Sequence, residues 1–179
     1  MKKYQIIYAD PPWQYNAGDF LAQTSLVTSN DNYQYESMKF NDILSLPIAS
    51  ICDDNCLLFI WTTSAFLYGA IQCGNAWGFT FSSVGFVWNK ERVNPGNHTM
   101  TSCEFVLIMK HGKIPQPRGA RNIKQYLSAL RSTHSTKPIE IRNRITKMFP
   151  TQQKIELFAR QKTIGWDSWG NEVKNDIIL

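Results

Sequence analysis

Segments of strand length alternate with segments of helical periodicity along this chain, and no other feature limits the possible folds as strongly. Alternation of this kind predicts an α/β fold. The segments between these elements at residues 14–39, 90–102 and 111–124 are expected to be long loops, which in a domain of this size are usually functional or mobile. Strands are expected at residues 5–9, 56–61, 80–89, 104–110 and 154–159, and helices at residues 41–51, 64–77 and 138–149.

The length of 179 residues predicts a single domain covering residues 1–179. No apolar run approaches the ~20 residues that a membrane span needs. The apolar stretch after the basic start breaks at Asp10, which is too early for the core of a signal peptide. We therefore expect a cytoplasmic protein.

The cysteine pattern favours reduced thiols over a disulfide framework or a metal site. Cys52 and Cys56 have metal-like spacing, but no second closely spaced pair and no nearby histidine accompany them. We expect no metal, and Cys73 and Cys103 complete the set of free thiols.

Basic residues are concentrated in one part of the chain. Residues 110–147 contain ten Lys or Arg and one acid, Glu140, whereas the remainder contains nine basic and thirteen acidic residues. Such a block is typical of a surface that binds a polyanion, although a merely solvated surface remains an alternative.

The most informative motif is the tetrad Asp10, Pro11, Pro12 and Trp13, which follows the first expected strand. The amino nitrogen of adenine is a poor nucleophile, so an enzyme that methylates it needs acceptors for its two hydrogens. A carboxylate and a backbone carbonyl are such acceptors, and the prolines fix the backbone without competing for hydrogen bonds. Trp13 could stack on a base, which is worth ~1–3 kcal/mol. The alternative is an ordinary turn that ends a strand.

The tetrad and an ordered series of further matches resemble the MT-A70 family of adenine-N6 methyltransferases, in its small bacterial or phage type. The resemblance covers nearly the whole chain. It departs from the family pattern before Lys137, where Thr136 replaces a frequent histidine. The matches lie at residues 35–38, 41–43, 46–47, 58–62, 77–79, 88–90, 135–138, 154–160, 165–166 and 169–172.

This resemblance implies a Rossmann-like class I methyltransferase fold in permuted order, with a mostly parallel central sheet flanked by helices. The absence of a Gly-x-Gly-x-x-Gly pattern after any expected strand agrees with S-adenosylmethionine, rather than a nicotinamide, as cofactor. The implied catalytic residues are Asp10, Pro11, Pro12 and Trp13. The implied cofactor-binding residues are Asp10, Lys137, Glu156, Arg160, Asn171 and Glu172.

The nucleic-acid substrate is expected to contact two groups of residues. Trp13, Tyr35, Trp88 and Lys90 would line the adenine pocket, with an ordinary core role as the alternative for Tyr35 and Trp88. Arg118 and Arg121, from the basic block, would contact phosphates beside the active site.

Together these features predict a site-specific enzyme that methylates N6 of adenine in nucleic acid, with DNA favoured over RNA. The alternatives are an RNA adenine-N6 methyltransferase and a catalytically weak nucleic-acid-binding subunit of the same fold. A homodimer or a partner subunit is left open, and no membrane partner is expected.

Overall fold

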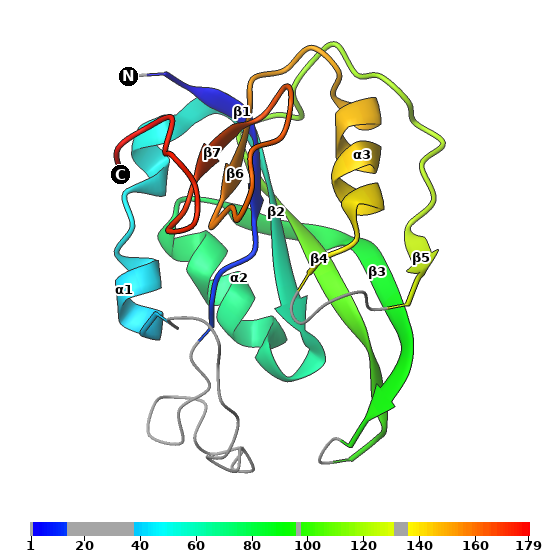
Figure 1. The fold of residues 1–179 in the computed structure, drawn as a ribbon. Helices are drawn as coiled ribbons and strands as arrows, with labels where there is room; N and C mark the ends of the chain where they lie inside the picture. The colour runs from blue at the N-terminus through cyan, green and yellow to red at the C-terminus, as the bar shows by residue number, and fades with distance from the viewer. Residues whose placement is uncertain (1, 14–37, 96–97, 131–135) are drawn as a thin grey trace.

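The computed structural model describes residues 2–13, 38–95, 98–130 and 136–179. Within these ranges seven strands form one mixed sheet in the order β5-β3-β4-β2-β1-β6-β7 (Figure 1). Neighbours pair in parallel except at β4, which is antiparallel to both β2 and β3. The elements are β1 (Tyr4–Ala9), α1 (Phe40–Leu44), η2 (Ile48–Ile51), β2 (Cys52–Thr63), η3 (Ser64–Phe66), α2 (Leu67–Ala76), β3 (Thr80–Asn94), β4 (Thr101–His111), β5 (Tyr126–Ser128), α3 (Ile139–Met148), β6 (Lys154–Leu157) and β7 (Asp167–Trp169).

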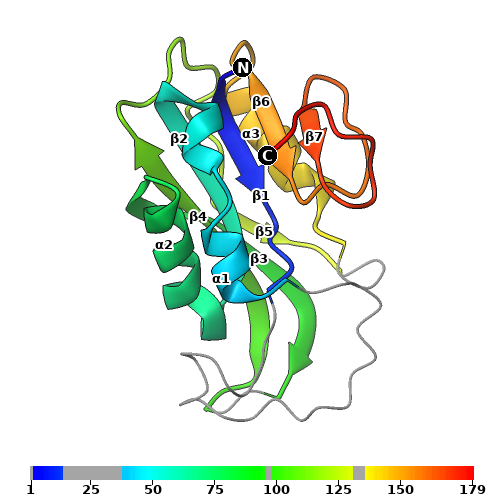
Figure 2. The same cartoon turned by 90° about the vertical axis from the view of Figure 1, so that its left-hand side faces the viewer.

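Helices cover both faces of the sheet, so the α/β prediction is confirmed. One face packs against α1, η2 and α2, and the other packs against α3 (Figure 2). Because side chains alternate along β1, Ile7 belongs to the first core and Tyr8 to the second. This layered sheet is consistent with the Rossmann-like methyltransferase fold that the resemblance implies.

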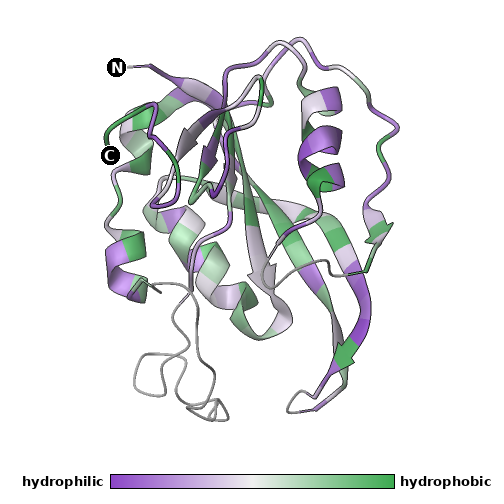
Figure 3. Cartoon of the chain, viewed as in Figure 1, coloured by the Kyte–Doolittle hydropathy of each residue, from purple (hydrophilic) through white to green (hydrophobic). Residues whose placement is uncertain are grey.

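The strands at the centre of the sheet are apolar along most of their length (Figure 3). β1 lies between β2 and β6 and is parallel to both, so it is covered on both faces and both edges. A strand in this position needs a nearly continuous apolar run, which explains why residues 5–9 were recognisable as a buried strand.

The carboxyl end of β1 lies at a point where the strand order reverses. The chain first continues from β1 to β2 on one side and returns much later to place β6 on the other side. In open α/β sheets, ligands bind in the crevice outside the carboxyl ends of strands at such a switch point. Asp10 is the first residue beyond this end of β1.

Several expected boundaries were wrong. The single helix at residues 41–51 is two short helices, because Pro47 lacks the N–H that an uninterrupted helix would need. The loop expected at residues 90–102 is largely a continuation of β3 and β4, which extend together as an antiparallel arm beyond the carboxyl edge of β2. The strand expected at 154–159 ends at Leu157, since Phe158 has a φ of 60°.

Other local signals were read correctly. Gly78 follows α2 with a φ of 87°, a left-handed conformation that glycine adopts without strain. Pro138 lies at the N-cap of α3, one residue before the position expected for it. The four cysteines are free thiols. Strands β5 and β7 were not predicted, since three residues are too few for a recognisable period.

Candidate active site

The tetrad forms a tight turn at the carboxyl end of β1. The backbone N–H of Trp13 donates to the carbonyl of Pro11 at 2.8 Å, and the N–H of Met38 donates to the carbonyl of Pro12 at 3.1 Å. Pro11 and Pro12 add no donors of their own. The Asp10 carboxyl is therefore presented from a rigid backbone, on the side of the sheet that α3 covers.

Four charged side chains converge beside this turn. Lys137, just before α3, places its Nζ 3.0 Å from Asp10 Oδ1 and 3.4 Å from Glu104 Oε2. Glu104 Oε1 in turn lies 3.2 Å from Lys90 Nζ. We call this set, Asp10, Lys137, Glu104 and Lys90, the charge cluster. Its two carboxylates and two ammonium groups come from β3, from β4, from the residue after β1 and from the residue before the N-cap of α3, so only the folded chain assembles it.

Burial and ion pairing act in opposite directions on the two central groups. Burial raises the pKa of Asp10 above its usual range, and the neighbouring Lys137 offsets only part of this effect. Burial lowers the pKa of Lys137, but Asp10 and Glu104 more than compensate, so its pKa is raised. Lys137 is consequently protonated at neutral pH, whereas Asp10 is a carboxylate that holds a proton more readily than an exposed aspartate.

An aromatic wall supports the cluster from β2. The ring of Trp61 lies 5.4 Å from Lys137 Nζ, close enough for a cation–π interaction. The Nε1–H of Trp61 donates to the hydroxyl of Tyr8 at 2.6 Å. Trp88 packs edge-to-face against Trp61 at 6.0 Å. These contacts fix the wall and exclude water from one side of Lys137.

A second ion pair lies on β6, next to the switch point. Glu156 is opposite Tyr8 in the strand register and pairs with the buried Arg142 of α3. Burial raises the pKa of Glu156, and Arg142 opposes that shift. Arg142 Nε is buried without a hydrogen-bond partner among the described residues.

The segments after β6 and β7 approach each other closely. The N–H of Ala159 donates to the carbonyl of Trp169 at 3.0 Å, and a Cβ added at Gly170 would lie 2.3 Å from the carbonyl oxygen of Ala159. Only glycine fits there. Beyond this contact, Arg160 Nε lies 3.6 Å from Glu172 Oε1, and both side chains are partly exposed at the surface. Asn171 is exposed beside them.

Comparison with known proteins agrees with this geometry. The model of the MT-A70 family matches residues 4–172. The chain belongs to the MT-A70 family. It is 43% identical over 188 residues to the type II methyltransferase M.MunI of a Mycoplasma species, which covers 99% of this chain and 81% of that protein.

More distant relatives carry names that specify adenine. The chain is 25% identical over 189 residues to the human N(6)-adenosine-methyltransferase catalytic subunit METTL3, covering 99% of this chain and 29% of that protein. It is 25% identical over 193 residues to the human N(6)-adenine-specific methyltransferase METTL4, covering 96% of this chain and 38% of that protein. The chain thus spans most of the bacterial relative and well under half of the human ones.

The structure brings together most of the site residues expected of an MT-A70 protein. Asp10, Pro11, Lys137, Lys90 and Glu156 surround the carboxyl ends of β1 and β6. Arg160, Asn171 and Glu172 follow β6 and β7 at the same edge of the sheet. Tyr35 lies outside the described residues.

Trp13 and Trp88 are both core residues. Trp13 is only 8% exposed, and its ring packs against Phe66 at 4.6 Å and against Phe40 at 6.3 Å. Its Nε1–H donates to the carbonyl of Trp61 at 3.3 Å. Trp88 is 2% exposed and donates to the carbonyl of Ala129. The described residues around Trp13 therefore cover most of its ring, and contact of Trp13 and Trp88 with the adenine stays a prediction.

Arg118 and Arg121 lie near the carboxyl end of α3. Between them, Gly119 and Ala120 donate backbone hydrogen bonds to the carbonyls of Met148 and Lys147, at the carboxyl end of α3. Lys137 stands at the opposite end of this ten-residue helix, about 15 Å away. The two arginines therefore lie toward the end of α3 that is away from Lys137, and their contact with phosphates stays a prediction.

The basic block of residues 110–147 is not one continuous surface either. Lys137 and Arg142 are used in the ion pairs described above. Arg144 pairs with Glu140 and donates to the carbonyls of Lys124 and Tyr126. A count of charges along the sequence could not separate these internal cations from exposed ones.

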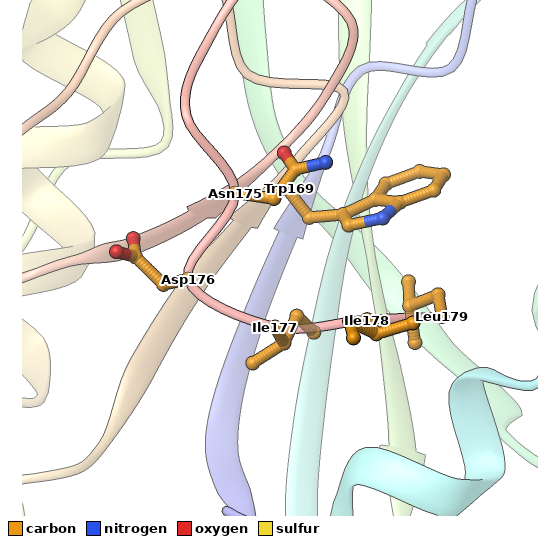
Figure 4. Close-up of a pocket in the computed structure, with 6 residues that line it drawn as sticks. All are labelled: Trp169, Asn175, Asp176, Ile177, Ile178 and Leu179. Carbon is orange, nitrogen blue, oxygen red and sulfur yellow. The ribbon is translucent and has the colours of Figure 1, made fainter.

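A pocket of about 360 Å³ lies on the other face of the sheet, between Trp169 and the C-terminal residues (Figure 4). Ile177 and Leu179 line it and pack against the core of α1 and α2. Its polar residues are already engaged, since Asn175 accepts from the N–H of Gly170 and Asp176 from the N–H of Ser168. None of the expected site residues lines this pocket.

In the part of the chain that the structure describes, no group of three or more His, Cys, Asp and Glu side chains could hold a metal ion. No helix in that part is long and apolar enough to cross a membrane.

Sequence reasoning missed Glu104, Arg142 and Tyr8. Glu104 had one usable signal, because it is an acid directly before the apolar run at residues 105–109 of β4. An acid at such a position needs a partner, but the sequence did not indicate which one.

Proposed function

We propose that this chain transfers a methyl group from S-adenosylmethionine to the exocyclic N6 of adenine in DNA. The observation that carries the proposal is the placement of Asp10. Its carboxyl stands at the switch point beyond β1, with one oxygen held by Lys137 and the following backbone fixed by two prolines. Membership of the MT-A70 family supports adenine as the target.

Asp10 and Pro11 would orient the amino group. Lys137 engages Oδ1 of Asp10, so Oδ2 would accept one amino hydrogen. The Pro11 carbonyl already accepts from the Trp13 N–H and keeps a second lone pair for the other amino hydrogen. With both hydrogens held, the nitrogen lone pair faces the methyl donor. The carboxylate also stabilises the positive charge that develops on nitrogen.

The residues at this edge suit S-adenosylmethionine, whose sulfonium would supply the methyl group. Lys137 has three donors and matches a carboxylate. Arg160, Asn171 and Glu172 match a ribose and a purine edge. The close approach of Gly170 to Ala159 leaves backbone rather than side chain next to that ligand. Glu156, held by Arg142, would shape the pocket from β6.

DNA is favoured by the 43% identity to a type II methyltransferase, a name used for enzymes that modify DNA. The relatives named for adenosine are much less similar. The target base must leave its stack to reach Asp10, so the enzyme either flips it or uses single strands. We place this activity in the cytoplasm of a bacterial cell, in line with the bacterial relative.

The test compares methyl incorporation from labelled S-adenosylmethionine into matched single-stranded DNA, duplex DNA and RNA that carry the same adenines. Oligonucleotides already methylated at every adenine N6 serve as the control. We expect label in at least one DNA form, recovered as N6-methyladenine after digestion. Activity on RNA alone would contradict DNA as the substrate and retain the adenine chemistry. Absence of label in all three polymers would favour the weakly catalytic subunit.

A further inference from the structure

Glu104 occupies the centre of the charge cluster, although the sequence of the tetrad did not predict a role for it. It lies near the start of β4, opposite Trp88 in the strand register, where the β3–β4 arm leaves the sheet. Its two carboxylate oxygens have different partners, since Oε1 faces Lys90 and Oε2 faces Lys137. The side chains of Glu104, Lys90 and Lys137 are 17%, 11% and 19% exposed, so solvent screens these pairs only weakly.

We propose that Glu104 is a positioning residue that holds the ammonium group of Lys137 against Asp10. The inference rests on the function proposed above, because that function requires Lys137 to keep a fixed position beside Asp10. Glu104 does not itself touch the reacting atoms. It acts on them through its contact with Lys137.

Lys137 needs such an anchor for physical reasons. It immediately precedes Pro138, the N-cap of α3, where the helix dipole disfavours a cation. Its side chain is long and flexible, and burial alone lowers its pKa. A single pair with Asp10 would leave the ammonium free to swing about that contact. A second carboxylate from another strand fixes its position from a different direction.

The arrangement also distributes the three donors of the ammonium group. Asp10 and Glu104 take two of them, and the Trp61 ring covers one side at 5.4 Å. Within the described residues Asp10 and Glu104 are the ion-pair partners of Lys137, which leaves a third donor for an anionic ligand group at the switch point. Lys137 can therefore contact Asp10 and a ligand at the same time. A lysine paired with Asp10 alone would lack the second contact that fixes the position of its ammonium group.

Lys90 completes the cluster by balancing the charge of Glu104. An uncompensated Glu104 would oppose ionisation of Asp10, because Glu104 raises the pKa of Asp10. With Lys90 at 3.2 Å, the four groups sum to zero charge. The other charged groups that act on Asp10 are Glu156 on β6 and Arg160 beyond it.

The experiment follows the titration of the Lys137 side chain by NMR in the full chain without nucleic acid or cofactor, so it does not depend on activity. Glu104→Gln keeps the shape and removes the charge, and should lower the pKa of Lys137 by about one unit or more. Lys90→Gln removes a neighbouring cation and should shift the same pKa upward. Opposite shifts cannot come from general loosening of the fold. Glu140→Gln, which breaks only the surface pair with Arg144, is the matched control and should leave Lys137 unchanged.

Activity provides the second readout. Glu104→Gln should reduce kcat by about 10–100-fold, the scale expected when a positioning contact is lost, and move the alkaline limb of the pH–rate profile to lower pH. Glu104→Asp, which keeps the charge on a shorter side chain, should recover part of both effects, and it takes over both measurements should Glu104→Gln fail to fold. An unchanged Lys137 titration in Glu104→Gln would overturn the inference. A shifted titration in a protein that methylates no nucleic acid would instead overturn the proposed function.

Discussion

Two lysines with little solvent exposure, at opposite ends of the sheet, have opposite pKa shifts. Lys137, at the carboxyl end, lies between two carboxylates, which together raise its pKa despite burial. Lys154, at the amino end of β6, donates to the carbonyls of Phe149, Pro150 and Gln152, and burial lowers its pKa. Lys154 closes the turn after α3. The comparison teaches that the partners of a buried charge, and not its residue type, separate a structural role from a chemical one.

Replacement of Lys137 should have the largest effect. In Lys137→Met, Asp10 loses its counter-ion, and the proposed cofactor loses a contact. We expect turnover to fall by about 100-fold or more, with weaker binding of S-adenosylhomocysteine by calorimetry. Normal affinity for S-adenosylhomocysteine would remove Lys137 from the cofactor site.

Replacement of Lys154 provides the matched contrast. Lys154→Met should leave three carbonyls without their donor and lower the free energy of unfolding by about 1–3 kcal/mol, measured by urea denaturation. Turnover of the folded enzyme should stay close to that of the parent. A loss of turnover in a Lys154→Met protein that remains folded would contradict the purely structural role of Lys154, and with it the contrast to Lys137.

The pH dependence of activity should reflect Asp10. Its carboxyl must be ionised to accept an amino hydrogen, and burial raises its pKa. The acid limb of kcat/KM should therefore lie above the usual aspartate value of about 3.9. Stability should not follow the same course. A carboxyl whose pKa is raised on folding binds its proton more tightly in the native state, so its contribution to stability increases as the pH falls through that pKa. Full activity at pH 4 would contradict the environment described for Asp10.

The smallest effect is expected at Arg118 and Arg121. Because both lie near the end of α3 opposite Lys137, and a ten-residue helix is about 15 Å long, Arg118→Gln combined with Arg121→Gln should leave kcat unchanged. Any contact of theirs with distant phosphates would flatten the salt dependence of DNA binding by ~2 log–log units at most. A large drop in kcat at saturating DNA would show that these arginines reach the reacting centre.

Features encoded by neighbouring residues could be predicted from the sequence. The strand before Asp10, the rigid tetrad and the stop at Gly78 each depend on local chemistry, and each was found. Glu104 and Arg142 could not be assigned to the site from the sequence, because their partners lie on other elements and no local pattern identifies those partners. The burial of Trp13 could not be predicted for the same reason, since nothing in the tetrad shows that Phe40 and Phe66 pack against its ring. The β3–β4 arm looked like a loop because its residues are polar and exposed, while its strand pairing depends on the backbone.

The most direct test of the account replaces Asp10 with asparagine, which has nearly the same shape and no charge. Parent and Asp10→Asn enzymes would be incubated with labelled S-adenosylmethionine and DNA, and N6-methyladenine would be quantified by mass spectrometry. Thermal unfolding of both proteins would verify that the variant is folded. We predict that Asp10→Asn remains folded and forms N6-methyladenine at least ~100-fold more slowly. Near-normal formation of N6-methyladenine by a folded Asp10→Asn enzyme would contradict the central role of this carboxylate.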